Sequence, residues 1–404
     1  MTSRIPIRPA DLRGAARLAT DATAGLADLV EAMHERIARL PWPGRAPPDG
    51  RVGGIAGMVY RSVRGVARGV GGGIEALLGS LETAPSGADP SPGREAVVAA
   101  LNGVLGDRLA AGANPLAIPM ALRRDGRALE LARDALAARL PEAGPSLLVL
   151  LHGLCMSDLQ WTRAGHDHGR ALARDLGLTP VYLHYNSGLH VSTNGHALAL
   201  LLERLVEQWP RPLRRLVLVG HSMGGLVARS ALHRAAATGQ RWPARVSDLV
   251  CLGTPHQGAP LERAGHWVHT LLGAAPYAAP LARLGRLRSA GITDLRHGSL
   301  LDDDWSGHDR FATRAGHRPR PVPLPAGVRC YALAASTGAR AGSPVERRPG
   351  DGLVPVDSAL GRHRDPSRAL GFPDERQWIG HGMNHLDLLS RPEVYAQLRR
   401  WLAT

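Results

Sequence analysis

A serine framed by glycines is the residue best placed to do chemistry. Ser222 lies in the stretch GHSMGG (residues 220–225), which contains the pattern G-x-S-x-G between an apolar run and a helical pattern. That context predicts a nucleophile elbow, a tight strand-to-helix turn that lifts a serine hydroxyl above the carboxyl edge of a sheet. The flanking glycines fit because a Cβ there would clash with the neighbouring strand and helix. The alternative is a chance match to a short motif, which the flanking patterns disfavour.

A serine hydroxyl needs a base within hydrogen-bond reach and an acid that holds the tautomer of the base. In folds with this elbow the acid and then the histidine follow the serine along the chain. The stretch RRPGDGLVPVDSALG offers Asp351 and Asp357, and GHGMNHLDLLS offers His381 and His385. We favour Asp351, because its Asp-Gly pair follows a strand, whereas Asp357 is more typical of a cap on a short helix. We favour His385, because it precedes the last amphipathic helix, whereas His381 is nearer the strand end.

An acyl-transfer site also needs two donors that point at the oxyanion of the tetrahedral intermediate. One is the backbone NH of Met223, directly after the serine. The second is expected from the loop after SLLVLLHG, which indicates the backbone NH of Leu154. The alternative is that HGLCMSD is only a turn that ends a strand. His152 and His221 flank the two turns, and we expect them to hold backbone rather than to react.

The elements that position these residues form an alternating pattern after residue 112. Apolar runs suited to strands covered on both faces lie at 146–153, 180–186, 214–220, 246–253, 327–336 and 376–380. Helical segments lie near 163–176, 193–209 and 223–238. The pair Asp125-Gly126 between two short runs predicts a leading hairpin. The order predicts an α/β fold with a mostly parallel, doubly wound sheet and helices on both faces.

Residues 1–112 are predicted to form a helical extension and residues 113–404 the catalytic domain. Apolar stripes at 26–40 and 59–77 and a third helix from about Glu95 to Ala111 make up the extension. Glycines weaken the second stripe, so it packs closely against a neighbour or lies on a membrane surface with its arginines outward. We favour core or dimer packing, and peripheral membrane contact through these helices is the alternative.

About seventy residues separate two of the predicted strands, which is far more than an ordinary connection needs. This insertion, about 258–325, contains HWVHTLLGAAPYAAPLARLGRL, which reads as an amphipathic helix or helix pair. We expect a cap or lid over an apolar acyl pocket. The alternative is a surface excursion without a gating role. The acidic run at 302–304 in the same insertion is expected to be a solvated turn.

Composition limits the other function classes. The formal charge is +14, but the chain has no lysine and its arginines are spread along the sequence, which argues against nucleic acid as a partner. The absence of lysine excludes Schiff-base chemistry. The three cysteines have no paired spacing and are expected to be buried thiols. No signal peptide or spanning helix is visible, so a cytoplasmic location is expected, with membrane association as the alternative.

The motifs HGL (152–154), GHSMGG (220–225), GTPHQGAP (253–260), GDGLVP (350–355) and MNHLD (383–387) resemble those of a known superfamily. From about residue 145 onward the chain resembles α/β-hydrolase lipases and esterases, within them bacterial triacylglycerol lipases and the GPI inositol-deacylase-like group. The resemblance implies the same roles as the residues do: Ser222 as nucleophile, His385 as base and Asp351 as acid, with Leu154 and Met223 as oxyanion donors. The helical first hundred residues are not part of the common lipase pattern.

Some lipases of this kind bind a structural calcium through the aspartate after the histidine, here Asp387. Calcium needs several oxygen ligands, and the sequence offers no convincing second carboxylate, so no metal is predicted. No cofactor is implied.

These residues together predict a serine carboxylic-ester hydrolase that acts on a lipid or another apolar ester through an acyl-enzyme. An acyltransferase, or a thioesterase or amidase, would use the same residues. A lipid-binding protein without activity on a hydrolase fold is the alternative from another class. The natural ester and the oligomeric state are not encoded in any motif.

Overall fold

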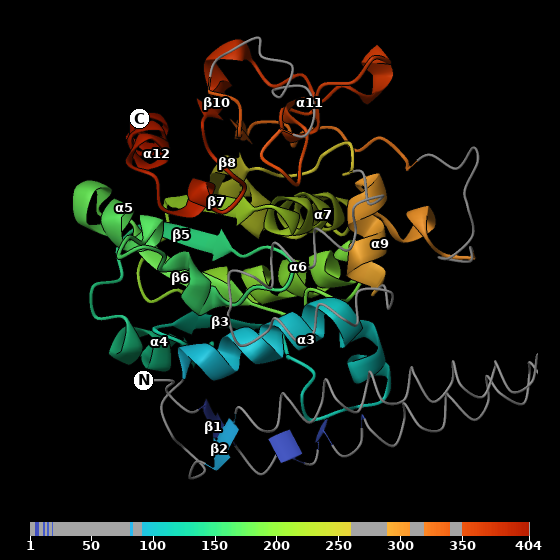
Figure 1. Ribbon diagram of the computed structural model, residues 1–404. Helices are drawn as coiled ribbons and strands as arrows, with labels where there is room; N and C mark the ends of the chain where they lie inside the picture. The colour runs from blue at the N-terminus through green and yellow to red at the C-terminus, as the bar shows by residue number, and fades with distance from the viewer. Residues whose placement is uncertain are drawn as a thin grey trace, which may run out of the picture.

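The computed structural model describes residues 5–7, 11, 12, 14, 15, 18, 81–83, 91–259, 289–307, 319–339 and 350–403. Its central feature is an eight-stranded sheet with the strand order β10-β9-β8-β7-β5-β6-β3-β4 (Figure 1). The strands are β3 (Ala121–Arg124), β4 (Arg127–Ala128), β5 (Ser146–Leu151), β6 (Thr179–His184), β7 (Arg215–His221), β8 (Val246–Leu252), β9 (Arg329–Ser336) and β10 (Gln377–His381). All six predicted apolar runs are therefore strands.

Every pairing from β10 to β6 is parallel, and only β3 and β4 are antiparallel to their neighbours. The predicted hairpin joins β3 and β4 through Asp125 and Gly126, whose φ angles are 52° and 72°. Positive φ at both central residues is the signature of a type I′ hairpin turn. In β5 five consecutive residues are buried, so both faces of the sheet are covered at its centre. The predicted doubly wound α/β sheet is confirmed.

The helices described around the sheet are α3 (Pro92–Ala111), α4 (Arg133–Arg139), α5 (His168–Leu176), α6 (Val191–Gln208), α7 (Met223–Ala237), α9 (Ala290–His297), α11 (Val356–Ala359) and α12 (Pro392–Leu402). The sequence did not predict α4 or α9, whereas the segments predicted near 163–176, 193–209 and 223–238 correspond to α5, α6 and α7. Helix α6 packs along α7, and α5 packs with α12, so two helix pairs flank the sheet (Figure 1). A small parallel sheet of β1 (Ile5–Ile7) and β2 (Leu81–Thr83) lies near α3.

Helix α3 is the third helix predicted for the extension, and it begins three residues earlier than expected. Ser91 is its N-cap and Pro92 its first residue, which suits a helix start. The helix lies against the loops that follow β5 and β6: a Cβ on Gly103 would overlap Cys155, and a Cβ on Gly106 would overlap Asn186. Helix α3 is therefore packed directly on the edge of the sheet where the candidate site lies.

Other parts of the predicted extension and cap lie outside the described residues. This applies to the stripes at 26–40 and 59–77 and to the cap helix at 266–287. The boundary at residue 112 and the cap boundaries stay predictions. No helix among the described residues is both long enough and apolar enough to cross a membrane.

The prediction for the cysteines is confirmed, whereas the prediction for the acidic run 302–304 is partly wrong. The three cysteines are buried free thiols, as predicted. The sequence predicts a solvated turn at 302–304, and this is wrong for Asp304, which is 2% exposed. Its carboxylate accepts hydrogen bonds from the backbone NH groups of Leu300 and Leu301 at 2.8 and 3.0 Å, because Asp304 is the last residue of the short turn Asp302–Asp304 and its side chain caps the start of that turn.

Candidate active site

The turn between β7 and α7 has the geometry of a nucleophile elbow. Ser222 has φ 55° and ψ −120°, a conformation that residues with a Cβ rarely adopt. The strain is held by the surrounding backbone: the NH of Ser222 donates to the carbonyl of Leu252 at 2.8 Å, and its own carbonyl accepts from the NH of Gly225 at 3.2 Å. The Ser222 side chain is buried, and its Oγ has no hydrogen-bond partner within the described part of the chain.

The glycines around Ser222 are required by close backbone contacts. A Cβ on Gly220 would lie 2.6 Å from the carbonyl carbon of Gly224, and a Cβ on Gly224 would overlap the carbonyl oxygen of Leu151 on β5. The spacing of G-x-S-x-G therefore lets α7 start directly against β5 and β7.

Gly224→Ala is expected to destabilise the fold by about 2 kcal/mol or more, because the new methyl group meets backbone that has no room to move. Any activity of the site should fall together with stability. Gly144→Ala is the matched control, since a Cβ there would make only ordinary contacts, at 3.8 Å. Urea denaturation of both variants measures the difference, and equal free energies of unfolding would contradict the packing argument.

Asp351 and His385 form a buried pair at the carboxyl edge of the sheet. Asp351 lies in the loop after β9 and His385 in the loop after β10, and His385 Nδ1 is 2.6 Å from Asp351 Oδ2. The other carboxylate oxygen, Oδ1, accepts from the backbone NH groups of Leu353 and Val354 at 2.9 and 2.7 Å. The backbone NH of His385 also donates to the carbonyl of Asp351 at 3.1 Å. The carboxylate is thus fixed on both oxygens and orients the imidazole.

The two alternatives that the sequence left open are placed differently. Asp357 lies in the first turn of α11, its side chain is 67% exposed, and its nearest ion-pair partner is Arg362 at 3.9 Å. His381 is the last residue of β10 and is only partly buried. The structure brings Asp351, not Asp357, to His385.

The His385 ring lies at the end of β8, beside the elbow. A Cβ on Gly253 would be 3.0 Å from Cε1 of His385, and Gly253 directly follows Leu252, whose carbonyl holds the NH of Ser222. His221 lies next to Ser222 in the chain, and its ring centroid is 4.7 Å from that of His385. The three predicted catalytic residues therefore meet at one edge of the sheet, although their roles stay predictions.

The two predicted oxyanion donors lie on either side of Ser222, one in the loop after β5 and one at the start of α7. A Cβ on Gly153 would be 3.1 Å from Cβ of Ser222, so the loop after β5 passes directly beside the elbow. Leu154 is buried in that loop, and Met223 is the first residue of α7. The NH groups in the first turn of a helix have no partner within the helix and carry partial positive charge. The backbone around Ser222 is thus suited to an anion.

His152 and His221 hold backbone, in line with the expectation from sequence. His152 donates from Nδ1 to the carbonyl of Gly153 at 2.8 Å, and its ring stacks on Tyr185 at 4.3 Å. His221 donates from Nε2 to the carbonyl of His385 at 3.2 Å. Burial lowers the pKa of His152 to about 3, and burial, together with electrostatic repulsion from the neighbouring His385 ring, keeps the pKa of His221 well below its usual range. Both rings are neutral donors. Tyr185, whose OH donates to the carbonyl of His152, carried no sequence signal.

Stability should fall as the pH falls below the ordinary histidine pKa of 6.5. Burial lowers the pKa of His152 to about 3 and that of His168 to about 4, so below pH 6.5 the unfolded chain binds protons that the folded chain does not. The two together should cost roughly 4 kcal/mol between pH 6.5 and 4.5. Urea denaturation across that range measures it. His168→Gln should flatten the profile, and substitution of the exposed His363 should not; a flat wild-type profile would contradict these assignments.

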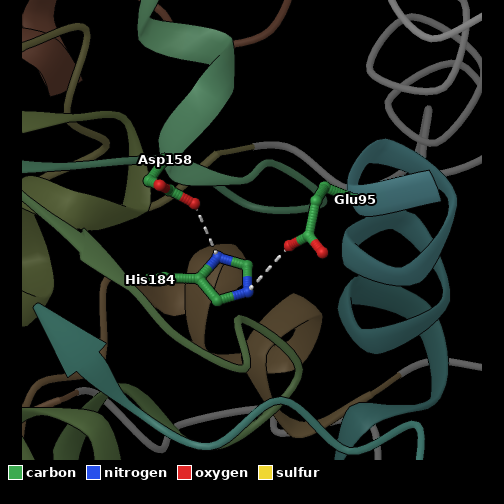
Figure 2. Close-up of side chains that lie close together, drawn as sticks. All are labelled: Glu95, Asp158 and His184. Atoms are coloured by element: carbon green, nitrogen blue, oxygen red, sulfur yellow. Dashed lines mark ion pairs between the residues drawn. The ribbon is translucent and has the colours of Figure 1, made fainter. Parts of the chain in front are cut away.

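A buried cluster of Glu95, Asp158 and His184 has the spacing of a metal site but is already neutralised (Figure 2). His184 lies 3.2 Å from Asp158 and 3.6 Å from Glu95. Nη1 of Arg123 contacts the same two carboxylate oxygens, at 2.9 and 3.2 Å. Burial alone would raise the pKa of Asp158, but His184 and Arg123 outweigh it and hold that pKa below its usual value. The cluster therefore reads as an ion-pair network that ties α3 to β3, β6 and the loop after β5.

The Asp387 carboxylate is engaged with the backbone of the loop around His385. Its Oδ2 accepts from the backbone NH of Asn384 at 2.8 Å, and Oδ1 of Asn384 accepts from the NH of Asp387 at 3.1 Å. The carboxylate thus closes a local turn. Among the described residues, the group of three around His184 is the one with metal-ligand spacing, and Asp387 is not part of it.

Residues 147–318 match the model of a family described as a PGAP1-like alpha/beta domain. This part of the chain is therefore similar to that family. The match starts in β5 and includes the elbow, so the resemblance inferred from the motifs is confirmed at the level of the superfamily. Asp351 and His385 lie beyond the matched residues, and so does α3, which precedes them.

Solved structures that are similar to this chain include proteins named as lipases and esterases. The mature lipase BlEst2 of Bacillus licheniformis is 19% identical over 64% of this chain and 92% of its own, with a TM-score of 0.41. Naproxen esterase of Bacillus subtilis is 15% identical over 63% and 83%, with a TM-score of 0.37. A lipase-esterase related protein of Clostridium acetobutylicum is 13% identical over 65% and 96%, with a TM-score of 0.36. No curated protein matches the sequence significantly.

Proposed function

We propose that the chain is a serine carboxylic-ester hydrolase for apolar acyl esters. The observation that carries this proposal is the buried pair of His385 and Asp351, 2.6 Å apart, at the edge of the sheet where Ser222 sits in a strained turn. A serine, an imidazole and a fixed carboxylate in that order along the chain are the parts of an acyl-transfer site. The match of residues 147–318 to a PGAP1-like alpha/beta domain is consistent with it.

In the proposed reaction Ser222 Oγ attacks the ester carbonyl carbon, and His385 Nε2 takes the hydroxyl proton. Asp351 holds the opposite ring nitrogen and stabilises the imidazolium. The carbonyl oxygen becomes an oxyanion next to the backbone NH groups of Leu154 and Met223, each of which is expected to contribute about 3 kcal/mol to the transition state. His385 returns the proton to the leaving alcohol. It then activates a water that releases the acid from Ser222.

The proposal assigns residues 113–404 to the catalytic domain, residues 1–112 to an extension and the segment near 258–325 to a cap that shapes an apolar pocket. An apolar lipid or ester is the expected partner. Helix α3 supports a structural role for its part of the extension, because it packs on the loops that carry Cys155 and Asn186 beside the site.

A substrate panel tests the reaction type. The purified chain is given p-nitrophenyl esters from acetyl to long-chain acyl, together with a matched thioester and anilide. We expect saturable ester hydrolysis, with a slower anilide, and release of free acid whether or not an acceptor alcohol is present. Preferential transfer to the alcohol, or turnover of the thioester alone, would contradict the assignment.

A further inference from the structure

A polar pocket lies beside α7, apart from the elbow at the start of that helix. Its volume is about 160 Å³, and it is formed by α7, the segment after β8, the end of α9, and the segments 319–323 and 367–370. The described lining contains Arg229, Arg320 and Arg368 together with His256 and His297, and no aspartate or glutamate. Cationic side chains without carboxylates indicate a site for an anion.

Arg229 is the deepest cation of this pocket and is 3% exposed. Its Nη1 donates to His256 Nδ1 at 3.1 Å and its Nη2 to the carbonyl of Val322. Its Nε is buried and has no acceptor among the described residues. Burial lowers the pKa of Arg229 to about 10, so the guanidinium stays charged at neutral pH. A buried charge whose partners are all neutral is costly unless an opposite charge joins it.

The nearby thiols do not supply that charge. Burial raises the pKa of Cys251 and of Cys330 to about 12, so both are neutral at physiological pH. The Asp304 carboxylate, on the adjoining segment, accepts hydrogen bonds from the backbone NH groups of Leu300, Leu301 and Arg320.

His256 adds a second donor. It is 5% exposed, and its Nδ1 must accept from Arg229 because a guanidinium only donates. Its proton therefore sits on Nε2, which is buried and has no acceptor in the described part of the chain. Burial and the charge of Arg229 keep the pKa of His256 well below its usual range, which makes the ring a neutral donor. Arg229 and His256, both in the lining of this pocket, thus each carry a buried N–H group that has no acceptor among the residues that the structure describes.

We propose that this pocket binds a small oxyanion of the phosphate type, held by Arg229 and His256. Three guanidinium groups without a carboxylate favour a divalent anion over a monovalent one. The site is distinct from the elbow, because Arg229 lies seven residues after Ser222, two turns along α7. The anion is either free phosphate or the phosphate of a headgroup-type monoester. The inference is independent of the proposed hydrolase activity.

The test is the thermal melting of the full chain in inorganic phosphate, in glycerol phosphate and in chloride, at matched pH and ionic strength. Binding to the folded state alone raises the melting temperature, and we expect a rise of about 3 °C at saturating phosphate. A rise with inorganic phosphate alone assigns the pocket to the free ion, and a rise with both assigns it to a substituted phosphate. Equal melting temperatures in all three solutions would overturn the proposal.

Substitutions in the pocket test whether the rise in melting temperature comes from phosphate bound at this site. Arg229→Met keeps most of the side-chain volume and removes the charge; it should melt no lower than wild type in chloride and lose the phosphate response. Arg234→Met is the matched control, since Arg234 is exposed on the same helix and should leave the response unchanged. If Arg229→Met fails to fold, His256→Phe removes the second donor and should weaken the response at least threefold in apparent affinity. A full response in a folded variant at either position would overturn the assignment.

Discussion

Ser222→Ala is expected to abolish turnover of p-nitrophenyl esters, with a loss of about four to six orders of magnitude in kcat. The oxygen is removed from a side chain whose Oγ makes no hydrogen bond within the described structure, so folding should be retained. The backbone strain at φ 55° is the same for serine and alanine. Initial rates with a short-chain ester, alongside thermal melting, measure both effects.

Ser230→Ala is the matched control for that loss. Ser230 lies on the same helix and donates from Oγ to the carbonyl of Leu300 at 2.7 Å, far along α7 from the elbow. Its loss should cost about 1 kcal/mol of stability and leave kcat within a few-fold of wild type. Substantial activity in Ser222→Ala would show that another residue is the nucleophile.

Asp351→Asn is expected to lower kcat by about four orders of magnitude. The amide oxygen of asparagine can still accept from the NH groups of Leu353 and Val354, so the loop should keep its shape. Its NH₂ group would then face His385 Nδ1, which favours the wrong tautomer of the imidazole and leaves Nε2 protonated. Kinetics at saturating substrate, with melting to confirm the fold, measure the effect.

Asp357→Asn separates a catalytic role from a general effect of charge. The Asp357 side chain is 67% exposed and lies 3.9 Å from Arg362, so its neutralisation should be silent. A silent Asp351→Asn together with a severe Asp357→Asn would reverse the assignment of the acid.

Local patterns made the sheet and the elbow predictable. The six central strands are short apolar runs bounded by turns, and Asp125-Gly126 has the positive φ angles that only a few residue types accept. The elbow was also predictable, because backbone contacts exclude any side chain at Gly220 and Gly224 and so require glycine at both positions of the G-x-S-x-G pattern. Asp351 was predictable as the acid because its Asp-Gly pair lies in a loop directly after a strand, whereas Asp357 resembles a cap on a short helix.

Features set by long-range packing were not predictable in this way. Nothing in the sequence of α3 indicates that Gly103 and Gly106 lie against Cys155 and Asn186. Asp304 was read as solvated because it belongs to an acidic run, yet it is buried as a turn cap. The Arg229 pocket joins segments more than a hundred residues apart, and a scattered arginine carries no sequence signal of burial.

The central claim is that the Ser222 hydroxyl is activated by His385 at the edge of the sheet. Covalent labelling with a fluorophosphonate, followed by mass spectrometry of the peptides, tests it most directly. The account predicts one adduct, on the peptide that contains Ser222, absent in Ser222→Ala and much slower to form in Asp351→Asn. No adduct on the folded wild-type chain, or an adduct on a different serine, would contradict it.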